Sequence, residues 1–285
     1  MQAFKKILLL LTEDYYQKEI KVIQQFLTHI KPEKLFIAVL TENHDYFDLN
    51  NFNIKKEIKD YLQKNLTISY EFLDKHSEDE IIKFILTENI DLSIMYNYRE
   101  NNALDEYIIK FILKLNSNIL LIPGECEEFT IKKIMVATDF SDYSREALEY
   151  GKYIQSIFKE SQLKLIHIAA VPVGYHYTGL SLEEFSNKLK ENAVLKIKEF
   201  LKESIPYEIH SVYKHKNVVP EILNIAAAEK TDLVIFGYQG ASSKLDFLYV
   251  GSSTMQMVNI HSLPLLIVKI KEKQKSLLEK ILLNS

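Results

Sequence analysis

The chain has 285 residues, of which 47% are hydrophobic and 26% charged, and its formal net charge is −4. This composition is that of a folded globular protein, and the length fits two domains better than one. The charge excludes the strong positive surface on which sequence-independent nucleic-acid binding depends, and it gives no attraction to anionic membranes. The single cysteine, Cys126, excludes an intrachain disulfide and a multi-thiolate metal site, and such sparing use is typical of a reducing compartment.

The first apolar run, ILLLL at 7–11, follows a basic start and so resembles a secretory signal. However, it is shorter than the apolar region of such signals, and acidic residues follow it without a small-residue cleavage site. No apolar segment of the chain reaches the length of about 18 residues that a membrane span needs. We therefore predict a buried strand at 7–11 and a cytoplasmic protein.

Further short apolar runs follow in the first half, and they are typical of parallel strands buried on both faces. They are LFIAVL at 35–40, ISYEFL at 68–73, DLSIMY at 91–96 and ILLI at 119–122. The segments between them have helical spacing of apolar residues. One such face comprises Ile54, Ile58, Tyr61 and Leu62, and another comprises Leu104, Ile108, Phe111 and Leu115. This alternation of strands and helices predicts a doubly wound α/β fold.

The second half repeats the same order with five more predicted strands. They are IMVA at 134–137, LKLIHI at 163–168, YEIHSVY at 207–213, DLVIFG at 232–237 and LPLLIVK at 263–269. The stretch KKIL at 5–8 matches KKIM at 132–135 at an offset of 127 residues. Asp91-Leu92 matches Asp232-Leu233 at an offset of 141. These matches indicate a duplicated unit with small insertions.

The joint between the two copies is PGECEEFT at 123–130, which is polar and rich in turn-forming residues. We therefore predict one domain at 1–125, a second at 131–270 and a short helical tail at 271–285. An apolar stripe in the second domain is predicted to pack in the core. It comprises Leu182, Phe185, Leu189, Ala193, Ile197 and Phe200.

Candidate binding residues follow the strands of the second half. In open α/β sheets, ligands bind outside the carboxyl ends of the strands, where the strand order reverses. Thr138 and Asp139 follow the first strand, Ile168 ends the second, and Phe236 and Gly237 end the fourth. We expect these ends to converge on one crevice. The carboxylate of Asp139 can accept hydrogen bonds from a base or ribose, or it can cap the following helix.

The stretch GYQGASSKLDFLYVGSST at 237–254 contains three of the seven glycines of the chain. Gly237 and Gly240 permit close backbone approach or a positive φ. Gly251, Ser252, Ser253 and Thr254 lie at the start of a predicted helix, where the serines and the threonine offer hydroxyl groups. Exposed N–H groups and the dipole at such a helix start form an anion site without a lysine. The same residues are also ordinary turn and cap residues, so the spacing alone leaves both interpretations open.

Several familiar catalytic and binding motifs do not occur in the sequence. It has no G-x-x-x-x-G-K-[ST], no G-x-G-x-x-G and no G-x-S-x-G, which excludes a P-loop, a dinucleotide fingerprint and a nucleophile elbow. No histidine pair has the H-x-x-x-H spacing of a zinc site. His167 lies within an apolar strand, where we predict a hydrogen-bonded core histidine.

Five segments of the second half, taken in order, resemble the universal stress protein family. They are KKIMVATDFSDYSREALEYG at 132–151, LIHIAAVP at 165–172, TDLVIFGYQG at 231–240, VGSST at 250–254 and LPLLIVK at 263–269. The resemblance implies a five-stranded parallel sheet with helices on both faces. It also implies a nucleotide-binding subgroup that holds ATP in a Gly-x₂-Gly-x₉-Gly-Ser/Thr loop.

The resemblance assigns roles to individual residues of this chain. Asp139 and Ile168 would contact adenosine, with Phe236 and Gly237 nearby. The residues around the phosphates would be Gly240, Gly251, Ser252 and Ser253. The chain departs from the family pattern at two places, because ten residues separate Gly240 from Gly251 where the family has nine, and Ala137 stands where proline is common.

The first half departs further from the pattern. Thr12 stands in place of Asp139, Tyr96 in place of Gly237 and Arg99 in place of Gly240. A tyrosine or arginine cannot reproduce the close backbone approach that glycine permits. We infer that this half keeps the fold without the pocket, and the resemblance implies that it pairs with the second half as an intramolecular pseudo-dimer.

These observations lead to three hypotheses about function. The first is a cytoplasmic two-domain protein that binds ATP or a related adenine nucleotide, with or without Mg²⁺, as a stress sensor. It would hydrolyse ATP slowly at most, because phosphoryl transfer needs placed metal ligands and a cationic clamp, and the loop offers only Lys244 and Asp246. The second is an interaction or scaffold protein without nucleotide. The third is an enzyme acting on a nucleotide-like substrate, for which no nucleophile and base are identified.

Overall fold

The structure of the chain is a computed structural model. It describes residues 4–12, 14–41, 67–74, 78–98, 108, 111–112, 114–201, 204–213, 218–239, 252–260 and 262–270. The contacts divide the chain into two compact units. Unit 1 is Met1–Thr130 with Lys269–Ser285, and unit 2 is Ile131–Val268.

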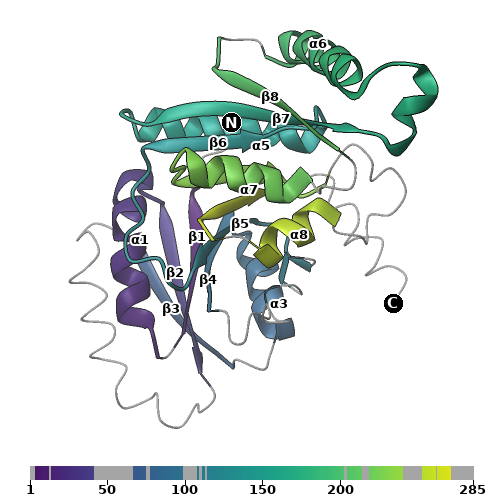
Figure 1. The fold of residues 1–285 in the computed structure, drawn as a ribbon. Coiled ribbons are helices and arrows are strands. Elements are labelled where there is room, and N and C mark those ends of the chain that lie inside the picture. The colour runs from purple at the N-terminus through teal and green to yellow at the C-terminus, as the bar shows by residue number, and fades with distance from the viewer. Residues whose placement is uncertain are drawn as a thin grey trace. The chain divides into compact units, whose positions relative to one another are not determined.

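Unit 1 contains a five-stranded parallel sheet (Figure 1). Its elements are β1 (Lys6–Thr12), α1 (Tyr16–Ile30), β2 (Lys34–Thr41), β3 (Thr67–Asp74), α3 (Glu78–Glu88), β4 (Leu92–Asn97) and β5 (Asn118–Pro123). The strand order is β3-β2-β1-β4-β5, and every pairing is parallel. All five strands predicted for the first half are therefore confirmed. The helical face predicted at 54–62 and the tail at 271–285 lie outside the described residues.

Unit 2 repeats this topology with a second parallel sheet. Its elements are β6 (Lys133–Ala137), α5 (Asp142–Ile157), β7 (Gln162–Val171), the 3₁₀ helix η1 (Val173–Thr178), α6 (Leu182–Phe200), β8 (Tyr207–Tyr213), α7 (Val218–Ala228), β9 (Leu233–Gly237), α8 (Ser252–Ile260) and β10 (Leu265–Val268). The order is β10-β9-β6-β7-β8. The predicted α/β class with two doubly wound sheets is confirmed.

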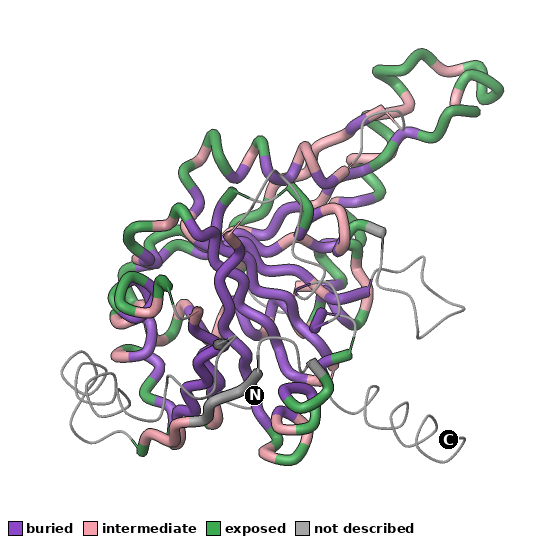
Figure 2. The backbone as a smooth tube through the Cα atoms, turned by 90° about the horizontal axis from the view of Figure 1, so that it is seen from below, coloured by how far each residue is buried: buried purple, intermediate pink, exposed green. Residues whose placement is uncertain are grey.

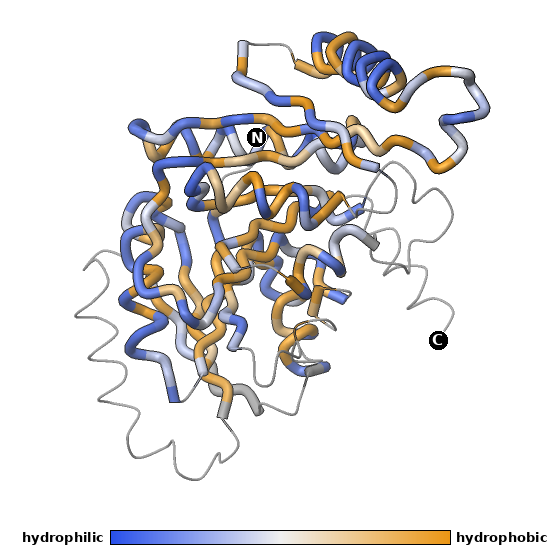
Figure 3. The backbone as a smooth tube through the Cα atoms, viewed as in Figure 1, coloured by the Kyte–Doolittle hydropathy of each residue, from blue (hydrophilic) through white to orange (hydrophobic). Residues whose placement is uncertain are grey.

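The inner strands form the core of each unit because both of their faces are covered, whereas the edge strand β8 has one buried residue among its seven. In β1, Leu8 and Leu9 point to opposite faces, and both side chains are 0% exposed. In β6, Ile134, Met135 and Val136 are likewise buried. Figure 2 shows the central strands as continuously buried backbone, and Figure 3 shows these central strands as largely hydrophobic. Burial on both faces explains why the apolar runs are continuous rather than alternating.

The two matched sequence stretches make the same contacts in both units. In unit 1, Asp91 Oδ2 accepts hydrogen bonds from the backbone N–H groups of Lys5 and Lys6, at 3.1 and 2.8 Å. In unit 2, Asp232 Oδ2 accepts from Lys132 and Lys133, at 2.8 and 2.7 Å. An aspartate before the fourth strand thus holds the start of the first strand in each sheet.

The apolar stripe of α6 differs from its prediction. Ala193, Ile197 and Phe200 are buried, but Leu182 is 43% exposed, so the prediction of core packing is wrong for that end of the helix. In the first half of α6, the ring of Phe185 lies 6.0 Å from that of Tyr175 in η1. Figure 2 shows the residues of α6 as mostly exposed.

Candidate functional site

The candidate site lies where the strand order of unit 2 reverses. From β6 the chain passes to β7 and β8 on one side, and then crosses to β9 and β10 on the other. The carboxyl ends of β6 and β9 therefore flank the switch point, where open α/β sheets bind ligands. Thr138 and Asp139 directly follow β6, and Tyr238 and Gln239 directly follow β9.

Thr138 organises the loop that joins β6 to α5. Its side chain is buried, and its Oγ1 accepts a hydrogen bond from Phe140 N at 3.0 Å. The same hydroxyl donates to Ser144 Oγ at 3.0 Å, and Ser144 Oγ donates to Ser141 O at 3.0 Å. The first turn of α5 is thereby connected to the end of β6.

Asp139 is exposed at this loop, and its Oδ1 accepts a hydrogen bond from Ser141 N at 3.1 Å. The N-cap of α5 is Ser141, whose side chain accepts from Ser144 N at 3.2 Å. Of the two alternatives for Asp139, helix capping is therefore not the one that the structure shows. Its carboxylate lies at the carboxyl end of β6, as the sequence predicts.

Phe140 has an unusual backbone conformation, with a φ of 66°. The left-handed region costs a non-glycine residue roughly 1–3 kcal/mol, and such strain persists only where the surroundings enforce it. The Phe140 ring lies 4.4 Å from the ring of His167 and 5.7 Å from that of Phe200. His167 Nδ1 lies 2.8 Å from Thr138 O, so the histidine is hydrogen-bonded as predicted, although it is only half-buried.

Gly237 ends β9 and supports the start of α5. A Cβ atom at this position would lie 2.6 Å from Tyr143 Cβ and 2.7 Å from Tyr143 C. Real side chains do not tolerate these distances, so only glycine lets the first turn of α5 approach the end of β9 this closely. The resemblance places Gly237 near adenosine, whereas in the structure this residue packs against Tyr143.

The hydroxyl of Thr254 connects α8 to the end of β9. Thr254 is 2% exposed, and its Oγ1 donates a hydrogen bond to Tyr238 O at 2.8 Å. The Thr254 hydroxyl hydrogen is therefore directed at the protein's own backbone. Burial, together with the nearby Tyr143, raises the pKa of the Tyr238 hydroxyl to about 12.

The remaining predicted site residues differ in what the structure describes. Ile168 in β7 and Phe236 in β9 are 7% and 6% exposed, so their side chains lie mostly within the core. Ser253 is exposed in the first turn of α8, which begins at Ser252. The last two predicted residues, Gly240 and Gly251, lie outside the described residues. The structure thus brings Thr138, Asp139, Gly237 and the start of α8 to the elements that border the switch point.

Comparison with known proteins gives the family. A model of the universal stress protein family matches residues 130–269. Universal stress protein MJ0531 of Methanocaldococcus jannaschii is 30% identical over 179 residues, which are 60% of this chain and 95% of that protein. The chain belongs to the universal stress protein family. MJ0577, a universal stress protein of the same organism, is 29% identical over 157 residues, which are 49% of this chain and 96% of that protein.

Solved structures show the same fold over nearly the whole chain. A putative universal stress protein from Pseudomonas aeruginosa has a TM-score of 0.70 at 16% identity, and the alignment covers 95% of each chain. A universal stress protein from Archaeoglobus fulgidus has a TM-score of 0.61 at 16% identity, with 94% of this chain and 99% of that chain covered. At this identity the likeness establishes the fold alone.

In unit 1 of this universal stress protein, a buried carboxylate occupies the end of the first strand. Glu19 in α1 is 0% exposed, and its carboxylate accepts hydrogen bonds from Thr12 N and Thr12 Oγ1, both at 2.9 Å. Burial raises the pKa of the Glu19 carboxyl to about 7, although the bonds from Thr12 favour its charged form. Glu19 was not among the predicted site residues, and its only signal in the sequence is an acidic residue on the apolar face of a helix.

Aromatic side chains fill the rest of that edge in unit 1. Tyr96, in place of Gly237, donates a hydrogen bond from its hydroxyl to Glu19 O at 2.5 Å. The rings of Tyr15 and Tyr98 stack with centroids 4.3 Å apart. The ring of Tyr98 also lies against Gly124, where an added Cβ would be 2.4 Å from Tyr98 Cδ1. The switch point of unit 1 is therefore lined by its own tyrosines and a glutamate.

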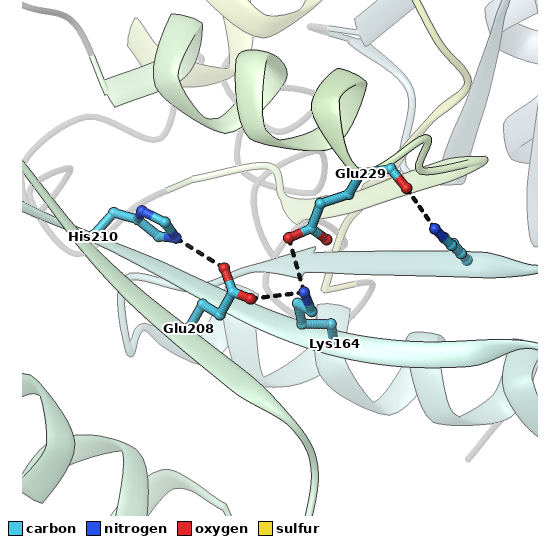
Figure 4. Close-up of polar contacts among 5 residues, drawn as sticks. Lys164, Glu208, His210 and Glu229 are labelled. Atoms are coloured by element: carbon cyan, nitrogen blue, oxygen red, sulfur yellow. Dashed lines mark hydrogen bonds and ion pairs between the residues drawn. The ribbon is translucent and has the colours of Figure 1, made fainter.

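A polar cluster on unit 2 lies away from the switch point (Figure 4). Lys164 Nζ in β7 forms ion pairs of 2.8 Å with Glu208 in β8 and with Glu229 after α7. His210 Nε2 is 3.0 Å from Glu208 Oε2. The bonds to Glu208 and Glu229 raise the pKa of Lys164, and the bonds from Lys164 and His210 lower the pKa of Glu208. The sequence analysis missed this cluster, whose contacts join β7, β8 and α7.

No helix in the described part of the chain is long and apolar enough to cross a membrane. No group of three His, Cys, Asp or Glu side chains in the same residues is arranged to hold a metal ion.

Proposed function

We propose that unit 2 binds ATP or another adenine nucleotide at the carboxyl ends of β6 and β9, and that nucleotide occupancy is a signal in the stress response. The observation that supports this most is the difference between the two switch points. Asp139 is exposed after β6, whereas the corresponding edge of unit 1 is filled by Glu19 and Tyr96.

The chemistry of the groups at this edge fits an adenine nucleotide. The carboxylate of Asp139 can accept hydrogen bonds from ribose hydroxyls or from an adenine amino group. The first N–H groups of α8 and the exposed hydroxyl of Ser253 are donors of the kind that phosphates require. Gly237 and Ile168 present backbone at the strand ends. The role proposed for Thr254 is to hold the start of α8 in place through Tyr238 O.

The proposal rests on binding and does not include turnover. A bound nucleotide would supply phosphate charge beside the starts of two helices, α5 and α8. Both helix starts carry a partial positive charge that favours an anion. Binding at the switch point would also join the ends of β6 and β9, and this provides a way for occupancy to change the surface of unit 2.

The first test is the nucleotide content of the protein purified from its host. One sample is denatured, and its supernatant is analysed for adenine nucleotide by liquid chromatography. Binding of MgATP is measured on a separate sample of native protein from which any bound nucleotide has been removed. Gly251→Arg should abolish binding, because the resemblance assigns Gly251 to the phosphates. Gly174→Arg is the matched control, since Gly174 is exposed in η1, where an added Cβ meets only Tyr177 at 3.5 Å or more.

A thermal shift gives the second reading of the same proposal. A ligand at 100 times its dissociation constant that binds only the native state stabilises it by about 2.7 kcal/mol. A rise of several degrees in Tm with MgATP is therefore expected for the unsubstituted protein and for Gly174→Arg, but not for Gly251→Arg. Absence of bound nucleotide and of any shift in the unsubstituted protein would contradict the proposal.

The alternative of a scaffold protein without nucleotide is supported by a different surface. In η1 and α6, apolar side chains are unusually exposed: Tyr177 is 88% exposed, Leu195 is 61% and Leu182 is 43%. Exposed apolar side chains of this kind can contribute to an interaction surface. Two results together would favour the scaffold hypothesis. They are capture of a partner protein through this surface and the absence of a thermal shift with MgATP.

A further inference from the structure

The loop that carries Asp139 is held in a strained conformation by contacts on each side of that residue. On one side, the carbonyl of Thr138 faces His167 Nδ1 at 2.8 Å. On the other side, Phe140 has a φ of 66°, and its ring lies 4.4 Å from the His167 ring. One histidine in the neighbouring strand therefore contacts both residues that flank Asp139.

His167 acts on the loop through its side chain, whereas Ile168 is proposed to offer only backbone at the end of β7. Consecutive residues of a strand point to opposite faces of the sheet, so the His167 and Ile168 side chains lie on different faces of β7. The His167 ring lies on the face where Phe140 and Phe200 pack together. Its influence on a nucleotide would pass through the backbone of the loop.

The hydrogen bond fixes the form of the imidazole ring. A carbonyl oxygen only accepts, so Nδ1 must carry a proton that it donates to Thr138 O. Burial lowers the pKa of His167, with a smaller contribution from Lys196 in α6, although the bond to Thr138 and the charge of Asp139 oppose this. The neutral ring protonated on Nδ1 is therefore the form that holds the loop.

We propose that His167 is a positioning residue for nucleotide binding, which sets the conformation of the loop at residues 138–141 and so aims the carboxylate of Asp139 at the switch point. The inference rests on the proposed function of unit 2. Without the donor at Nδ1, the carbonyl of the buried Thr138 loses its partner, which favours rotation of that peptide. Phe140 then relaxes from its left-handed conformation, and Asp139 moves with it.

The test separates the hydrogen bond from the ring by two substitutions in the full chain. His167→Phe keeps an aromatic ring against Phe140 but removes the donor. His167→Asn places an amide Nδ2 at the position of Nδ1 and so keeps the donor without the ring. His210→Phe is the matched control, because His210 is a half-buried strand histidine that bonds Glu208 in the polar cluster. The dissociation constant for MgATP is measured by calorimetry for all four proteins.

The inference predicts that His167→Phe binds MgATP at least tenfold more weakly than the unsubstituted protein. His167→Asn should stay within about threefold of it, and His210→Phe should be unchanged. The amide hydrogen of Phe140 should also exchange faster in His167→Phe without nucleotide, because it bonds Thr138 Oγ1 in the native loop. If His167→Phe does not fold, His167→Leu replaces it as the apolar match of His167→Asn.

The outcomes distinguish this inference from the proposed function. Unchanged affinity in His167→Phe, beside an unsubstituted protein that binds, would overturn the inference and leave the proposed function intact. Equal losses in His167→Asn and His167→Phe would also overturn it, because the donor would then not be the cause. An unsubstituted protein that binds no adenine nucleotide would overturn both.

Discussion

The first strand of unit 1 ends at Thr12, and the corresponding residue of unit 2 is Asp139. The two residues are 127 positions apart, which is the offset that also relates Lys5 to Lys132. Glu19 and Glu146 are related by the same offset. In unit 1 the Glu19 carboxylate accepts hydrogen bonds from the Thr12 N–H and hydroxyl groups, and it is fully buried. The Asp139 carboxylate has no hydroxyl group to donate and would repel a second carboxylate. The exchange of threonine for aspartate thus removes one of the two donors that hold the buried carboxylate in unit 1.

The second difference lies at the end of the fourth strand. Gly237 lets α5 pack directly on β9, whereas Tyr96 extends to α1 and bonds the carbonyl of Glu19. The buried charges follow the same division. Among the described residues, the three charged side chains that are buried, Glu19, Asp91 and Lys269, all belong to unit 1. Glu19 is the one of these three that lies at the end of the first strand, where unit 2 has the exposed Asp139.

The largest expected effect concerns Lys269 in unit 1. Its Nζ donates to Ile112 O and Leu115 O, both at 2.5 Å, and burial lowers its pKa to about 7. The unfolded chain has the ordinary pKa of 10.5, so it binds the proton more tightly, and stability should rise between pH 7 and 10.5. The full window corresponds to roughly 4 to 5 kcal/mol at most. Urea unfolding of the intact protein and of Lys269→Met at several pH values would show whether the slope disappears with the lysine.

Glu19 should produce the opposite slope at lower pH. Its folded-state pKa of about 7 lies above the ordinary 4.5, so the native state binds the proton more tightly. Its contribution is fully present below pH 4.5 and is lost as the pH rises to 7, which amounts to roughly 2 to 3 kcal/mol. Glu19→Gln should remove this slope, while Glu33→Gln, at an exposed carboxylate, should retain it. Identical pH profiles for the intact protein and Glu19→Gln would refute the assignment.

Gly237→Ala tests the packing of α5 on β9. The added methyl group would lie 2.6 Å from Tyr143 Cβ, so we expect a loss of about 1–3 kcal/mol in the free energy of unfolding. Gly174→Ala is the matched substitution, because its Cβ would make only ordinary contacts from 3.5 Å outward. Its effect should be within about 0.5 kcal/mol. Equal effects of the two substitutions would show that the close approach at Gly237 is not what requires glycine.

Asp139→Asn gives the smallest expected effect in free energy and bears directly on binding. Removing the charge while keeping the shape should weaken MgATP binding by about tenfold, or about 1.4 kcal/mol. Asp142→Asn, at an exposed aspartate in the first turn of α5, should change affinity much less. Calorimetry of the two variants measures the difference in affinity. Equal losses would show that the charge of this region, and not the position of the Asp139 carboxylate, determines the affinity.

The sheets could be predicted from the sequence because their strands are buried on both faces. The run ILLLL at 7–11 has neither the 3.6-residue period of an amphipathic helix nor the two-residue alternation of a half-exposed strand. It lies in β1. The paired matches of KKI and Asp-Leu also coincide with real contacts, because Asp91 and Asp232 hold the strands that these stretches begin.

The details of the site could not be predicted in the same way. Left-handed backbone is ordinarily signalled by glycine or asparagine, so nothing in the sequence marked Phe140, whose conformation depends on His167 and Thr138. In the sequence, Glu19 resembles any charged residue of a helix. The hydrogen bonds that it accepts in its buried position come from Thr12, seven positions earlier, and helical periodicity does not indicate them. The apolar stripe of α6 gave no sign that Leu182 would be exposed. These features arise from contacts between elements, which periodicity does not describe.

The most direct test of the difference between the units is hydrogen exchange with and without MgATP. Mass spectrometry of peptides covering 138–144 and 252–258 should show slower exchange when nucleotide is bound. Peptides covering 12–19 and 92–98, which contain the filled edge of unit 1, should exchange at the same rate in both conditions. Protection confined to the unit 1 peptides, or no protection in either unit at saturating MgATP, would contradict the assignment of the nucleotide site to unit 2.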